Sequence, residues 1–224
     1  MAETIYKIGN KILKIGGKLL TVSGSGPGPS LPPYTIRLKY QDGVVPTFYK
    51  GTGVQVSSSP NVWDLTYENS DWSSLLQGDR SLLEVIDANS TGVSDMHYMF
   101  YNCQQLVSVQ LFDTSSVTSM GFMFNSCSSL TSVPLFDTSS VTNMFSMFNR
   151  CSSLTSVPLF DTSSVTTMNS MFYYCYKVES GALALYQQAS TQATVPSHSG
   201  TFRDCGRDTV TGAAELAQIP SDWK

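Results

Sequence analysis

The chain has 224 residues, of which 13% are charged and 41% are hydrophobic, and its formal net charge is −4. A chain with so few charges and an acidic balance offers no basic face for nucleic acid. No apolar run approaches the ~20 residues that cross a bilayer. We therefore expect no nucleic-acid partner and no membrane span, in a chain long enough to bury a sizeable core.

Residues 1–22 contain a short internal echo, KIGNKIL at 7–13 followed by KIGGKLL at 14–20. The Gly-Asn and Gly-Gly pairs favour tight turns between short strands over a coiled coil. Because so small a ribbon has too little core to stand alone, we predict a β segment for anchoring or oligomerisation, the alternative being a frayed terminus. The candidate anchoring side chains are Ile8, Ile12, Leu13, Ile15, Leu19 and Leu20.

The first residues also lack the basic region and unbroken apolar core of a signal peptide, so we expect no export by the general route. Residues 23–33, SGSGPGPSLPP, are predicted to form a Gly/Pro/Ser linker. Alternation of apolar and polar residues then predicts strands at 35–40, 54–56 and 62–67, which we assign to a β-rich N-terminal cap over residues 34–70.

A 24-residue repeat dominates residues 71–175, with units beginning at Val93, Val117, Val141 and Val165 and a worn unit before them. In each unit apolar residues recur at intervals of three and four, which predicts a helix, as over 142–150. The segment 154–159 predicts a short parallel strand with Val157 and Leu159 inward. Pro134 and Pro158 each lack an N–H donor, so the strands should be short or only partly paired.

Sulfur-containing side chains follow the same repeat. Eight of the nine methionines lie in the expected helices, and four of the five cysteines lie at the repeat interval. A zinc site needs closely spaced cysteine pairs, and the sequence has none. These side chains are therefore interpreted as a stacked core.

After the repeats, propensity predicts helices over 179–190 and 211–218, within a C-terminal cap at 176–224. The whole pattern predicts an α/β solenoid. Its units would be leucine-rich-repeat-like, each a 24-residue helix-strand pair, with a β-rich N-terminal cap and a mixed C-terminal cap.

The phrase FDTSSVTxMxxMFxxCxSLTSV, as at 112–133 and 136–157, resembles the BspA-type leucine-rich repeat of bacterial surface proteins and of phage and prophage proteins of gut bacteria. The resemblance covers residues 72 to about 175. Where that family commonly carries LxLSNFD, this chain has the shorter VPLFD, so a tighter corner is expected. The resemblance implies attachment or protein interaction and no enzyme activity.

Few residues could carry catalysis or bind a metal. His97 and His198 are isolated, so we expect a non-enzymatic protein without cofactors. Asp113, Asp137 and Asp161 form a ladder that could either bind calcium in stacked turns or cap each turn with its own side chain.

Residues 93–175 contain 27 serines and threonines but only five charged residues. Such a face is either a glycan- or protein-binding surface or simple solubilising filler. The candidate binding surface comprises Ser108, Gln110, Ser132, Pro134, Ser156 and Pro158.

The order of anchor, linker and repeats predicts a phage virion accessory protein, a fibre or decoration, and both caps also resemble those of phage structural proteins. The repeats would contact a host surface glycan or protein. Residues 1–22 would contact other virion proteins and would hold the chain in a homo-oligomer, with a trimer favoured. The alternative is an adhesin or interaction module at a bacterial cell surface.

Overall fold

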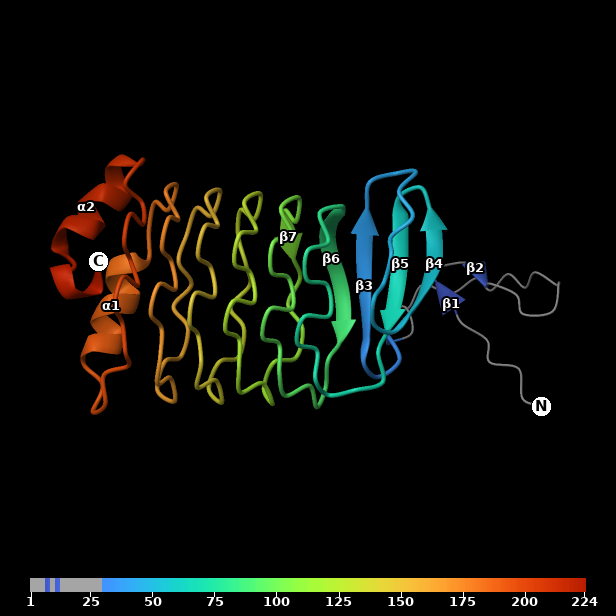
Figure 1. Ribbon diagram of the computed structural model, residues 1–224, viewed down its shortest axis with the longest axis horizontal. Coiled ribbons are helices and arrows are strands. Elements are labelled where there is room, and N and C mark those ends of the chain that lie inside the picture. The colour runs from blue at the N-terminus through green and yellow to red at the C-terminus, as the bar shows by residue number, and fades with distance from the viewer. Residues whose placement is uncertain (1–6, 9–10, 13–29) are drawn as a thin grey trace.

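The computed structural model describes residues 7–8, 11–12 and 30–224 (Figure 1). The first four of these residues form two paired antiparallel strands, β1 (Lys7–Ile8) and β2 (Lys11–Ile12). A five-stranded mixed sheet has the order β4-β5-β3-β6-β7, in which only the β6–β7 pair is parallel. Its strands are β3 (Thr35–Tyr40), β4 (Thr52–Ser58), β5 (Asn61–Thr66), β6 (Leu82–Asn89) and β7 (Ser108–Val109).

The central strand β3 shows why this sheet forms. Ile36, Leu38 and Tyr40 alternate along it and are all buried on one face. On the other face Arg37 pairs with Asp64 of β5, and Lys39 pairs with Glu84 of β6. The N···O distance is 2.7 Å in each ion pair. Both ion pairs join residues directly opposite each other in the strand register. Such cross-strand pairs favour this register over a slipped one. The strands predicted at 35–40 and 62–67 are therefore confirmed.

The repeat units follow the sheet as a row of irregular loops that lie side by side along the long axis of the molecule (Figure 1). At the far end of the row lie α1 (Ala182–Ser190), α2 (Val210–Gln218) and a 3-10 turn (Ser221–Trp223). The two helices match those predicted after the repeats.

The prediction of an α/β solenoid built from helix-strand units is wrong. Within the residues described, the regular structure is a small mixed sheet that is neither curled nor closed, and the only two α-helices, α1 and α2, come after the last repeat. The repeats contain no helix, and the segment 142–150 is a succession of turns.

Backbone hydrogen bonds explain why turns replace the predicted helix. The amide of Met147 donates to the carbonyl of Met144 (3.2 Å), and the amide of Cys151 donates to that of Phe148 (3.0 Å). Between these turns, amides donate to the next unit instead, as from Phe148 to the carbonyl of Met171 (2.9 Å). Ser146 and Arg150 have φ angles of 52° and 63°, which a right-handed helix excludes. Successive turns of three to four residues bury the same positions as a helix would, which is why the periodicity misleads.

The predicted strands of the repeats are also largely missing, for the reason that the prolines indicate. In the first full unit the amide of Gln110 donates to the carbonyl of Val85 (3.0 Å), next to β7. Pro134 and Pro158 occupy the equivalent position in the following units and have no N–H to donate. Only an isolated bridge, Ser156 to Ser180, remains there. The expectation of short or partial pairing is confirmed.

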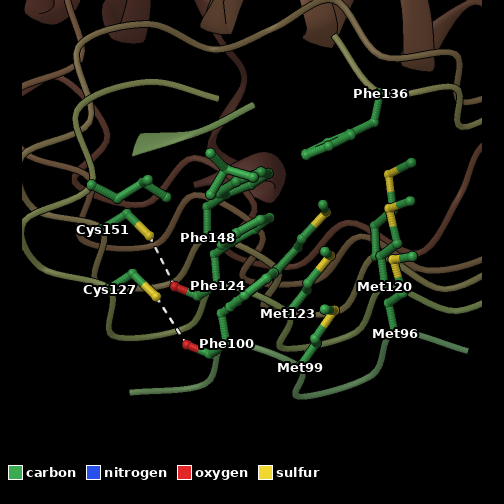
Figure 2. Close-up of a cluster of buried hydrophobic side chains, with 14 of the residues drawn as sticks. Met96, Met99, Phe100, Met120, Met123, Phe124, Cys127, Phe136, Phe148 and Cys151 are labelled. Atoms are coloured by element: carbon green, nitrogen blue, oxygen red, sulfur yellow. Dashed lines mark hydrogen bonds between the residues drawn. The ribbon is translucent and has the colours of Figure 1, made fainter. Parts of the chain in front are cut away.

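The core of the repeat row consists of columns of identical side chains (Figure 2). Phe100, Phe124, Phe148 and Phe172 are fully buried and stack nearly parallel, with ring centroids 5.2, 5.5 and 5.2 Å apart. All eight repeat methionines and the four repeat cysteines are buried as well, which confirms the stacked-core interpretation. Each such phenylalanine contributes on the order of 3–5 kcal/mol to the stability of the fold.

We find no helix among the described residues with the length and apolar character that a bilayer crossing requires.

Candidate functional site

A groove of about 690 Å³ crosses four successive repeat units, a volume within the usual range of ligand sites. Its walls are two rows of side chains, one directly before and one directly after each core cysteine. Because each cysteine is buried, its two neighbours are turned outward. The first row is Asn102, Ser126, Arg150 and Tyr174, the second is Gln104, Ser128, Ser152 and Tyr176, and Tyr101 completes the lining.

The first row has an unusual backbone. Asn102, Ser126, Arg150 and Tyr174 have φ angles of 62°, 63°, 63° and 64°, in the left-handed region. Asparagine tolerates this region well, and Gly78 occupies the same place in the unit before, but arginine and tyrosine carry a cost of roughly 1 kcal/mol there. The same left-handed backbone recurs outside the groove, at Tyr98, Phe122, Ser146 and Ser170, so it belongs to the turns of every repeat unit.

Aromatic rings gather at the C-terminal end of the groove. The ring centroids of Tyr174 and Tyr176 are 5.5 Å apart, and those of Tyr173 and Tyr174 are 3.9 Å apart. The hydroxyl of Tyr173 donates a 3.0 Å hydrogen bond to that of Tyr174, which raises the pKa of Tyr173. The Arg150 guanidinium lies 5.9 Å from the Tyr174 ring centroid, within cation–π range.

Arg150 is the one charged side chain that lines the groove. Across residues 30–224 it forms no ion pair, whereas nearby Arg207 pairs with Asp204 (3.2 Å) and Asp208 (3.3 Å). Arg207 also lies over the Tyr176 ring, 4.3 Å from its centroid. The groove therefore presents one free cation among hydroxyl, amide and aromatic groups.

The candidate binding surface predicted from sequence lies elsewhere. None of its residues lines the groove. Ser132 and Gln110 are exposed, and the other four are half-buried. The six occupy two rows at the repeat interval, Ser108, Ser132 and Ser156 in one and Gln110, Pro134 and Pro158 in the other.

That surface contains an unexpected apolar ladder. Leu111, Leu135 and Leu159 are 61%, 60% and 52% exposed. The prediction that Leu159 points inward is wrong, although Val157 is buried as expected. The amide of Phe160 donates to the carbonyl of Pro158 (3.0 Å) in a tight three-residue turn, so Phe160 replaces Leu159 in the core. This is the tight corner that the short VPLFD segment predicts.

The repeat aspartates cap their own turns. Asp137 accepts hydrogen bonds from the amide (3.0 Å) and the hydroxyl (2.7 Å) of Ser139, and Asp113 does the same with Ser115. These bonds hold the pKa of both carboxyls below the usual value. The geometry therefore supports aspartates that cap their own turns rather than aspartates that bind calcium. In the described part of the chain, no cluster of three or more histidine, cysteine or acidic side chains is arranged to hold a metal.

The remaining predicted residues are widely separated. His97 packs edge-on against Phe122 and is half-buried. His198 stacks on Trp223 with centroids 4.0 Å apart. Of the candidate anchoring residues, Ile8 lies in β1 and Ile12 in β2. The other four, Leu13, Ile15, Leu19 and Leu20, lie outside the described residues.

Sequence reasoning missed the groove because it treated the cysteines only as core. The signal is present in the residues that flank them, which read Asn-Cys-Gln, Ser-Cys-Ser, Arg-Cys-Ser and Tyr-Cys-Tyr in successive units. A buried cysteine between two polar or amphipathic residues at a fixed interval marks two parallel outward rows.

Comparison with known proteins identifies a family for the repeat region. A family model described as "Mycoplasma protein of unknown function, DUF285" matches residues 71–192. No curated protein and no solved structure matches the chain. The family match covers every unit that lines the groove and more than half of the 224 residues. The chain therefore belongs to the DUF285 family.

Proposed function

We propose that this chain is a non-enzymatic attachment protein whose repeats bind the surface of a host cell through the groove. The observation that carries the proposal is the pair of outward rows, in which four units contribute equivalent positions to one continuous site. Aromatic, amide and hydroxyl groups on a rigid scaffold are typical of recognition.

The stacked core keeps this site in place. Every groove residue except Tyr101 is bonded along the chain to a buried cysteine. Amides of the first row are tied to the next unit, as from Ser126 to the carbonyl of Asn149 and from Arg150 to that of Tyr173, both 2.8 Å. A ligand that contacts several rungs therefore meets side chains whose spacing is already fixed, which lowers the entropy cost of binding.

The finer proposal is that the repeats are of the BspA type and that the protein is a fibre or decoration of a phage virion. It is supported by the order of the segments predicted from sequence, a short β segment at 1–22, a linker at 23–33 and then the repeats. Residues 1–22 would attach a homo-oligomer to other virion proteins. The alternative location is a bacterial cell surface, with the same binding role.

Binding of labelled full-length protein to host cells tests the attachment role. The double variant Tyr174→Ala/Tyr176→Ala removes the aromatic end of the groove and should abolish most binding. Tyr49→Ala is the matched control, because Tyr49 is 90% exposed and does not line the groove. Equal binding by the two variants, at unchanged melting temperatures, would refute a role for the groove.

Location is tested separately. Mass spectrometry of purified phage particles should find the chain as a stoichiometric component. Recovery from the envelope of uninfected cells, and its absence from particles, would instead assign the protein to the bacterial surface.

A further inference from the structure

We infer that the groove binds an acidic polysaccharide, with a sugar-borne anionic group at Arg150 and sugar rings against Tyr174 and Tyr176. This inference rests on the function proposed above and names the chemical class of the ligand. It comes from the juxtaposition of one unpaired guanidinium, two tyrosine rings and a row of hydroxyl groups in one groove.

The charge of the groove selects for an anion. Arg150 is exposed and unpaired among residues 30–224, and no acidic side chain lines the groove. A guanidinium binds a carboxylate through two parallel hydrogen bonds, a geometry that a lysine cannot match. The chain as a whole is acidic, with a net charge of −4, so the attraction of an anion is local to this end of the groove, where Arg203 and Arg207 also lie over neighbouring tyrosine rings.

The tyrosines select for a ligand with both apolar and polar faces. The rings of Tyr174 and Tyr176 are inclined by 43° and are half-buried. Arg207 covers one face of the Tyr176 ring, so this ring offers only its remaining surface to the groove. A pyranose ring has an apolar face of C–H groups and an edge of hydroxyls, which suits an aromatic ring beside polar groups. Tyrosine supplies such amphipathic contact at low entropy cost.

The hydroxyl rows are arranged to accept hydrogen bonds from a ligand. The Ser126 hydroxyl donates to the side-chain oxygen of Asn125 (2.8 Å), and the Ser128 hydroxyl donates to the carbonyl of Gln104 (3.4 Å). The proton of each hydroxyl is thereby used within the protein, while its oxygen lone pairs are left for other donors. Sugar hydroxyls are abundant donors of this kind.

The groove also has the periodicity of a polymer site. Hydrogen-bonded neighbouring segments lie about 4.8 Å apart, so the four rungs place polar or aromatic side chains, different in each unit, at regular steps along the groove. An extended polysaccharide advances by a similar length with each sugar ring. Single-stranded nucleic acid fits less well, because it requires several cations along its backbone, and the groove has one.

The test uses the full chain on a glycan array that carries acidic oligosaccharides beside their carboxyl-reduced, neutral forms. The strongest acidic binder is then titrated by calorimetry. Arg150→Gln should weaken that binding by about tenfold or more, as expected for loss of a charge-assisted pair, and should leave the neutral form unaffected. Arg203→Gln is the matched control: Arg203 is exposed, lies 5.4 Å from the Tyr173 centroid and does not line the groove.

The outcomes separate this inference from the proposed function. Equal binding of acidic and neutral forms, weakened by Tyr174→Ala but not by Arg150→Gln, would overturn the acidic ligand and leave attachment through the groove intact. Binding to host cells without binding to any glycan would also overturn it, and would indicate a protein ligand. If neither cells nor glycans are bound, the proposed function fails together with the inference.

Discussion

The thiol of Cys151 donates a hydrogen bond to the backbone carbonyl of Phe124, 27 residues earlier, over an Sγ···O distance of 3.1 Å (Figure 2). Cys103, Cys127 and Cys175 make the same bond to the unit before them. Each thiol thus ties one unit to the previous one. Because the neighbours of these cysteines form the groove, the ladder also positions both of its walls.

The cysteines should be chemically silent in the folded protein. All five are buried, and burial raises the pKa of Cys127 to about 12 and raises that of the other four. We expect no reaction with Ellman's reagent at pH 8 until guanidinium is added, and then five equivalents. Rapid labelling of the native protein would contradict the buried ladder.

The same pKa shifts predict a loss of stability in alkali. The unfolded chain releases its thiol protons near pH 8.5, whereas the folded chain retains them to a higher pH. The unfolded state therefore binds fewer protons above this value, and the free energy of unfolding should fall as pH rises from about 9 towards 12. Urea titrations across this range measure the effect, and replacement of Cys127 by Val should reduce it.

Substitutions at Ser170 distinguish turns from helices. Its φ of 56° favours glycine, so Ser170→Gly should be more stable than Ser170→Ala by roughly 1 kcal/mol. In a helix the order would be reversed by a similar amount. Urea unfolding of the two variants provides the comparison, and a more stable alanine variant would argue for the helix.

Two adjacent residues test the tight turn of the repeat, which exposes a leucine and buries the phenylalanine that follows it. Leu135 is 60% exposed, so Leu135→Ser should change stability by no more than about 0.5 kcal/mol. Phe136 is buried and stacks against Phe124, so Phe136→Ala should cost about 3–5 kcal/mol. Similar losses in both variants would show that the leucine also lies in the core.

A calcium chelator should leave the stability of the protein unchanged. Asp137 satisfies the turn by accepting from Ser139, so a chelator should not shift the melting temperature, whereas Asp137→Ala should lower it. Because the pKa of Asp137 is lowered in the folded state, its contribution is present above the unfolded pKa near 4 and is lost as pH falls. A chelator-induced drop in melting temperature that is absent from Asp137→Asn would instead indicate a bound metal.

Some features of this structure could be predicted from sequence, and others could not. The buried columns at Met144, Met147, Phe148 and Cys151 follow from their periodicity, strand β3 follows from its alternation, and helix α2 follows from helix propensity. The prediction of a helix in each repeat is wrong because a series of turns buries the same positions. A series of turns differs from a helix in its left-handed backbone at non-glycine residues such as Ser146. This backbone conformation carries no reliable sequence signal.

The candidate site shows a similar limit. The hydroxyl-rich character of the repeats is visible in the sequence, but which hydroxyls converge depends on how each turn is oriented. The sequence favours Ser108, Gln110 and their equivalents because a strand would display these side chains outward. The tight turn at Pro158 instead exposes Leu159, and the groove forms around the cysteines.

The most direct test of the central claim is to map the bound ligand on the repeats by NMR. Titration of isotope-labelled full-length protein with the best-binding oligosaccharide should perturb the signals of Asn102, Ser126, Arg150 and Tyr174, one from each unit. The signals of Leu111, Leu135 and Leu159 should stay unchanged. If the leucine signals shift and the groove signals do not, the account is contradicted. The ligand would then bind the surface predicted from sequence.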